Sequence, residues 1–182
     1  GKIFFETKLP QKIVSEKTEP SKADPNELIS DPIVEEGIRL NLKYKGIKPA
    51  GELTEADLEK VTFFVFMANR ITDVGLKEVA KLQNLTDLDL SGTKITDAGL
   101  KEVAKLQQLN DLALNVSQIN GEGLKELAKL QKLTRLGFYG DQINPEIFNE
   151  MAKLQKLGSL TLNTSKITDA NLKNIAELQQ LT

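Results

Sequence analysis

The chain contains no cysteine, no histidine and no tryptophan among its 182 residues. Without cysteine it can form no disulfide, no thiolate nucleophile and no cysteine-ligated zinc site. Without histidine it lacks the commonest general base and the commonest transition-metal ligand. Any catalysis would have to use carboxylates or lysines, so the composition argues against an enzyme.

The lack of long apolar runs and of a positive net charge argues against two further classes, membrane-spanning and nucleic-acid-binding proteins. No run approaches the ~18 apolar residues of a membrane-spanning helix. The formal net charge of -2 argues against a nucleic-acid-binding protein held by phosphate neutralisation. Aromatic residues make up only 5% of the chain, while leucine occurs 28 times, so the core is expected to be aliphatic and built from repeats.

From residue 71 the sequence repeats itself with a period of 24 residues. The complete copies are 71–94, 95–118, 119–142 and 143–166, and a shorter copy occupies 167–182. In the first copy Leu76 and Val79 share one helical face, and Thr72 or Asp73 can cap that helix. The later Leu88-x-Leu90 has the spacing of a strand. Each copy is therefore predicted to be a strand and a helix whose apolar faces are buried by stacking.

The series Leu85-xx-Leu88-x-Leu90-xx-Thr93-x-Ile95 resembles the L-x-x-L-x-L-x-x-N/C-x-L pattern of the leucine-rich-repeat family. The ITDAGL opening resembles the cysteine-containing, F-box-type subclass and tandem repeats common in bacterial members. Thr93 departs from that pattern at the N/C position, but a short polar side chain can still bond the turn backbone. The resemblance implies an α/β, right-handed leucine-rich-repeat solenoid, a short horseshoe with a parallel sheet on its concave face and helices on its convex face.

The chain is divided into three regions by its composition and repeats. We predict an extended, polar N-terminal segment or linker at 1–32, an N-terminal cap with degenerate repeats at 33–70, and four full repeats plus a truncated fifth at 71–182. Six parallel strands are expected near residues 40–42, 64–66, 88–90, 112–114, 136–138 and 160–162. No polar capping repeat follows the last copy, which suggests truncation, a lost tail or an edge that pairs with another molecule.

Function is expected on the concave face, because its side chains differ between copies while the helix faces nearly repeat. The predicted partner-binding residues are Phe63, Val65, Met67, Asp87, Asp89, Asp111, Arg135 and Tyr139. The first three form an apolar anchor, unless the N-terminal segment or the cap covers them. The aspartates and Arg135 suit a basic or mixed-charge partner, or they form a solvated face. The spacing of the aspartates matches no calcium loop, so we predict no metal and no cofactor.

The prediction is thus a non-enzymatic protein-protein interaction module with an unknown protein partner. Two alternatives remain: a structural array that associates through its ends, and a module that binds glycans or small ligands on the same face. The proline-rich, charged lead resembles the spacer after a bacterial export signal or lipid anchor. It predicts an extracytoplasmic location, with a cytoplasmic adaptor as the alternative.

Overall fold

The structure, a computed structural model, describes residues 28–65, 70–140, 143, 145–164, 167–176, 178 and 181. Most of the predicted N-terminal segment and Met67 lie outside the described residues. The elements are, in chain order, α1 (Pro32–Tyr44), α2 (Glu55–Leu58), β1 (Phe63–Val65), α3 (Asp73–Val79), β2 (Asp87–Leu90), α4 (Asp97–Val103), β3 (Asp111–Asn115), α5 (Gly121–Lys125), the 3-10 helix η1 (Glu126–Lys129), β4 (Arg135–Tyr139), α6 (Pro145–Met151), β5 (Ser159–Asn163) and α7 (Asp169–Ile175).

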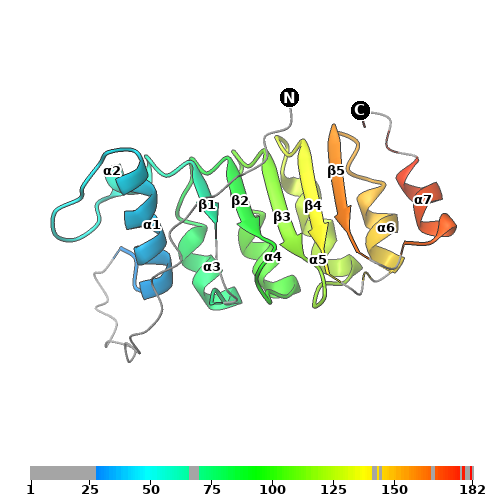
Figure 1. The fold of residues 1–182 in the computed structure, drawn as a ribbon, viewed down its shortest axis with the longest axis horizontal. Coiled ribbons are helices and arrows are strands. Elements are labelled where there is room, and N and C mark those ends of the chain that lie inside the picture. The colour runs from blue at the N-terminus through cyan, green and yellow to red at the C-terminus, as the bar shows by residue number, and fades with distance from the viewer. Residues whose placement is uncertain are drawn as a thin grey trace.

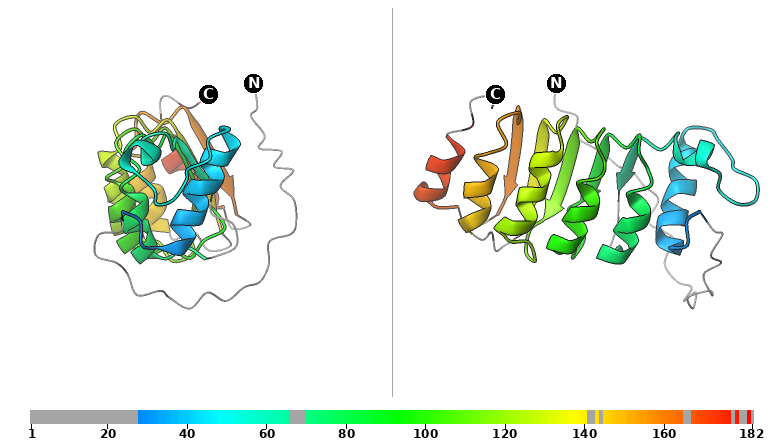
Figure 2. Two further views of the ribbon diagram at one scale, coloured as in Figure 1. Left: turned by 90° about the vertical axis from the view of Figure 1, so that its left-hand side faces the viewer. Right: turned by 180° about the vertical axis from the view of Figure 1, so that it is seen from behind.

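The strands form one parallel sheet of five strands in the order β1-β2-β3-β4-β5. Their register pairs residues that are 24 positions apart, so Leu88 lies beside Leu112 and Leu136 beside Leu160. The sheet forms one layer and helices α3 to α7 form the other, side by side along the molecule (Figure 1, Figure 2). The predicted α/β leucine-rich-repeat solenoid is confirmed.

Each repeat folds as the local sequence predicts. Leu88 and Leu90 are buried beneath β2, while the residues between and before them are only partly buried. Thr72 caps α3, because its hydroxyl accepts a hydrogen bond from the backbone of Gly75. At the position where the family pattern has Asn or Cys, the buried Thr93 hydroxyl donates to the carbonyl of Leu90 at 2.7 Å. A short polar side chain thus does bond the turn backbone there.

The prediction of a first strand at residues 40–42 is wrong, because this segment lies within helix α1. Asp31 caps the helix by accepting from the backbone of Ile33 and Val34, and Pro32 occupies its first turn. Apolar residues at helical spacing then bury one face of the helix: Val34, Ile38 and Leu42. Leu40 is 41% exposed, so the Leu40-Leu42 alternation that suggested a strand arises by chance within a helix.

Helix α1 lies against the first strand of the sheet and covers that end of the core. The Asn41 side-chain amide donates to the carbonyl of Phe63 at 2.5 Å, and the Lys45 ammonium donates to the Thr62 hydroxyl at 2.9 Å. Gly37 leaves room for the buried ring of Phe64, because a Cβ at Gly37 would lie 2.3 Å from the ring. The helix therefore packs against the edge strand β1 and supplies a partner to one of its backbone carbonyls.

Successive helices are joined by a repeated hydrogen-bonding device, which we call the Asp–Gly ladder. Asp73, at the start of α3, accepts from the Thr96 backbone at 2.9 Å and from the Thr96 hydroxyl at 2.6 Å. Asp97, at the start of α4, accepts from the Asn120 backbone at 2.9 Å. Each aspartate thus holds the N-cap residue of the next helix, which aligns neighbouring repeats.

The ladder explains the glycine in the repeated TDxGL segment. A Cβ at Gly99 would lie 2.4 Å from Asp73 Oδ1, and a Cβ at Gly123 would lie 2.2 Å from Asp97 Oδ1. The third copy has Gly121 in place of the aspartate, and the fourth has a fully buried Ile147 in place of the glycine. Gly99 and Gly123 therefore give space to an aspartate of the preceding copy, and Ile147 follows a copy that lacks this aspartate. At Gly75 the close neighbours of a Cβ would instead be the Ile71 side chain at 2.5 Å and Asp31 Oδ2 at 2.7 Å.

Candidate functional site on the concave face

The strand side chains that point away from the core form the concave face, in rows that cross the strands. The first row is Phe63, Asp87, Asp111, Arg135 and Ser159. The second row is Val65, Asp89, Ala113, Gly137 and Thr161. A third row contains Asn115, Tyr139 and Asn163. All the predicted partner-binding residues within the described part of the chain lie in these rows.

Arg135 joins two of the three aspartates. Its Nε donates to Asp111 Oδ2 at 2.8 Å, and its Nη2 lies 3.6 Å from Asp87 Oδ1. The hydrogen bond with Asp111 raises the pKa of Arg135, although partial burial acts in the opposite direction. The group is half exposed, so each pair contributes at most about 1 kcal/mol. The predicted cluster is therefore a mixed-charge network rather than three free carboxylates.

Asp89 differs from the other two aspartates. Its Oδ1 accepts from the backbone of Ser91 at 2.8 Å, which leaves the side chain fixed at the end of β2. Among the described residues no lysine or arginine forms an ion pair with it. The next two positions in its row are Ala113 and Gly137, which we call the Ala113–Gly137 floor. The two residues that follow Asp89 in its row therefore contribute a single methyl group of their own.

Tyr139 lies along the sheet rather than standing away from it. A Cβ at Gly137 would be 3.0 Å from Tyr139 Cε2 and 3.6 Å from its hydroxyl oxygen, so the ring covers Gly137. Burial raises the pKa of Tyr139, and the negative charges of Asp89 and Asp111 raise it further. The sequence predicted that Tyr139 lies on this face. The ring can lie flat along the sheet because Gly137, on the same strand, has no side chain to displace it.

The position of Tyr139 can be tested by titration, because the chain has two tyrosines and no tryptophan. In Tyr44→Phe the ultraviolet absorbance of the remaining phenol should titrate above the ordinary pKa of about 10. Adding Asp89→Asn should lower that midpoint. Since the folded-state pKa is raised, the stabilisation is present below the unfolded pKa and is lost as pH rises through the folded one. Tyr139→Phe serves as the control that assigns the signal, and a midpoint indifferent to Asp89→Asn would contradict this geometry.

The predicted apolar anchor is only partly exposed. Phe63 is half-buried, Val65 is 38% exposed, and Met67 is outside the described residues. At the backbone of this patch, the Asn41 side-chain amide of α1 donates to the carbonyl of Phe63. Val65 nevertheless offers apolar surface directly beside Asp89, with which it is paired across β1 and β2.

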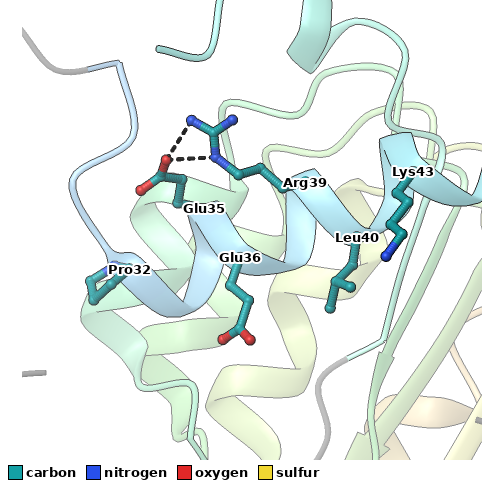
Figure 3. A pocket seen from close by; sticks show the side chains of 6 residues that line it. All are labelled: Pro32, Glu35, Glu36, Arg39, Leu40 and Lys43. Carbon is teal, nitrogen blue, oxygen red and sulfur yellow. Dashed lines mark hydrogen bonds and ion pairs between the residues drawn. The ribbon is translucent and has the colours of Figure 1, made fainter. Parts of the chain in front are cut away.

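A shallow hollow on the outer face of α1 was not foreseen from the sequence (Figure 3). It is lined by Pro32, Glu35, Glu36, Arg39, Leu40 and Lys43. Glu35 accepts from Arg39 at 2.8 Å, and Glu36 lies 3.6 Å from Arg70, so much of its charge is already paired. The side chains have helical spacing, a signal that the strand interpretation of this segment concealed.

Two structural features are absent from the described residues. In this part of the chain no group of three or more Asp or Glu residues is arranged to hold a metal ion. None of its helices is both long enough and apolar enough to cross a bilayer.

Comparison with known proteins supports the fold. Residues 81–104 match the family described as Leucine Rich repeat. No curated protein sequence matches the chain. Among solved structures, the actin-binding site 2 of leiomodin-1 is 18% identical, over 72% of this chain and 90% of that one, with a TM-score of 0.52. Internalin C2 from Listeria monocytogenes is 20% identical, over 85% of this chain and 82% of that one, with a TM-score of 0.44.

The C-terminal domain of tropomodulin from Caenorhabditis elegans is 14% identical, over 69% of this chain and 89% of that one, with a TM-score of 0.48. At these identities the likenesses concern the fold alone. The repeat match, the register of 24 residues and the two-layer architecture together define a leucine-rich-repeat solenoid. The cysteine-containing subclass and a bacterial origin stay predictions.

Proposed function

We propose that this chain is a non-enzymatic protein-interaction module that recognises a protein partner through the concave face. The observation that carries the proposal is the contrast between two rows of the same sheet. The core-facing row repeats leucine at Leu88, Leu112, Leu136 and Leu160. The row beside it on the concave face varies, from an aromatic through two aspartates to an arginine and a serine.

The physical setting favours this face over the helical one. Its backbone groups pair within the sheet, and helices α3 to α7 lie behind it, so its side chains are presented to a partner (Figure 1). On the helices, Glu78 pairs with Lys81 at 2.7 Å and Glu150 with Lys153 at 2.7 Å. Such pairs are solvated and contribute little. Extended concave surfaces are what solenoids use for binding.

The alternatives are less well supported. A glycan-binding face would use standing aromatic platforms, but Phe63 is half-buried and Tyr139 lies on Gly137. Association through the ends predicts sedimentation that depends on concentration. The proposed extracytoplasmic location rests on the composition of the N-terminal segment and on the resemblance to bacterial repeat proteins, and it belongs to this proposal rather than to the fold.

Affinity capture with quantitative mass spectrometry tests the proposal. The concave bait carries Val65→Asp, Asp87→Lys and Asp89→Lys, and the matched convex bait carries Lys77→Glu and Lys101→Glu on exposed helix positions. We expect a protein captured by the unmodified chain to be retained by the convex bait and reduced at least tenfold with the concave bait. Both baits must show the thermal unfolding midpoint of the unmodified chain.

The identified partner is then titrated against the same three chains. Loss of binding to the convex bait with full binding to the concave bait would place recognition on the helices and overturn the assignment.

A further inference from the structure

The charges on the concave face do not balance. Asp87 and Asp111 share Arg135, while Asp89 has no cationic partner in the described residues. The face therefore carries an excess of negative charge: two aspartates and one arginine leave the first row at -1, and Asp89 adds a second negative charge, in the second row, that no described cation pairs. Complementary charges across an interface give specificity and fix the position of the partner along the surface. A partner that lies on this face is expected to bring a cation to Asp89.

The surroundings of Asp89 suit a long cationic side chain. Beside it the Ala113–Gly137 floor offers only one methyl group, and neighbouring strands are about 4.8 Å apart. The ring of Tyr139 lies across Gly137 at the far side of this floor. A guanidinium or ammonium over Ala113 would lie between a carboxylate and an aromatic ring, which adds a cation–π contribution. Arginine suits this slot best, because its planar group both stacks and donates to a carboxylate.

An apolar position lies in the same row. Val65 pairs with Asp89 across the strands and is 38% exposed. Val65 and Ala113 are two strands apart, which is about 10 Å at ordinary strand spacing. In an extended chain, residues two or three positions apart are separated by about 7–10 Å. One extended segment that crosses the strands could therefore place an apolar side chain on Val65 and a cation on the floor.

We propose that the concave face binds an extended segment of a partner protein in which an apolar residue lies two or three positions from an arginine or lysine. The cation lies over Ala113 between Asp89 and Tyr139, and the apolar side chain covers Val65. This inference rests on the proposed function and adds the chemistry of the partner to it. Asp87, Asp111 and Arg135 act as a preformed network beside the slot and do not supply its charge.

Selection of short random peptides on the immobilised chain tests the inference. The selection is carried out with counter-selection against Asp89→Asn, which removes the charge and keeps the size. We expect enrichment of sequences with an arginine or lysine two or three positions from an apolar residue. A synthetic peptide of that pattern, free of tyrosine and tryptophan, is then titrated into Tyr44→Phe, in which Tyr139 is the sole tyrosine and its fluorescence reports binding.

Binding of that peptide should weaken at least tenfold with Asp89→Asn and by a similar factor when its cation is replaced by leucine. The two changes should not add, because both remove the same interaction. Lys77→Gln, which removes a charge from an exposed position on helix α3, is the matched control and should leave binding unchanged. Higher salt should weaken binding to the unmodified chain more than to Asp89→Asn.

The outcomes separate this inference from the proposed function. Selected peptides that lack a cation but lose binding to the concave bait would overturn the cation slot and leave concave recognition intact. Selected peptides that bind the concave bait fully and lose the convex bait would overturn both. A selection that enriches nothing counts against the slot, while the capture experiment decides the function independently.

Discussion

Replacing Phe138 by alanine should lower the free energy of unfolding by about 3–5 kcal/mol. Phe138 is fully buried beneath β4, where it pairs with Leu114 on one side and Leu162 on the other. The lost ring removes apolar burial and leaves a cavity between two repeats that cannot collapse without moving both strands. Because domains of this size are stable by only about 5–15 kcal/mol, the loss is a large fraction of the total.

Urea unfolding followed by circular dichroism measures this change. Val65→Ala is the matched control, since it truncates an apolar side chain that is 38% exposed on β1 and should change stability by about 0.5 kcal/mol or less. Equal effects of the two substitutions would mean that β4 is not packed into a common core. The slope of the unfolding transition should stay unchanged if the chain unfolds as one unit.

Replacing Gly99 by alanine should destabilise the protein, although alanine is intrinsically the better helix former by about 1 kcal/mol. A Cβ there would lie 2.4 Å from Asp73 Oδ1, so Asp73 must release its hydrogen bonds to Thr96 or the helices must separate. Overpacking of this kind costs about 1–3 kcal/mol. The net result expected is a loss of up to about 2 kcal/mol in the free energy of unfolding.

A double-mutant cycle identifies the cause. In the Asp73→Ala background the oxygen that meets the new Cβ is absent, so Gly99→Ala should become neutral or stabilising through helix propensity. The remaining close neighbour, a terminal methyl of Leu76 at 2.8 Å, lies at the end of a flexible side chain and can move. A penalty that is the same in both backgrounds would show that the Asp–Gly ladder does not explain the glycine.

The repeats could be predicted from sequence because their signals are local. Leu88 and Leu90 alternate, Thr72 precedes a helical apolar pattern, and the spacing of 24 residues brings equivalent strands together. The region before residue 53 has no intact copy to compare with. There the alternation at Leu40 and Leu42 is typical of a strand, while the longer apolar series from Val34 has helical spacing. The strand prediction was wrong, because the segment is helical.

The candidate site, too, could be predicted from the sequence only in part. Period-two alternation was enough to place Asp87, Asp89 and Arg135 on one face of the sheet. It could not show which carboxylate Arg135 would join, because that depends on side-chain conformation across three strands. The low position of Tyr139 likewise follows from the space above Gly137.

The sequence by itself determined the repeat, its strand and helix positions, the composition of the core and the rows of the concave face, because each follows from short-range periodicity. Only the tertiary structure decided that α1 packs against the first strand, that Asp73 holds the next helix through Thr96, and that Asp89 alone lacks a cation among the described aspartates of the face. These features depend on side chains from different repeats that come into contact. Which hydrogen bond or ion pair forms there is decided by distances of a few ångströms, and the residue types alone do not give those distances.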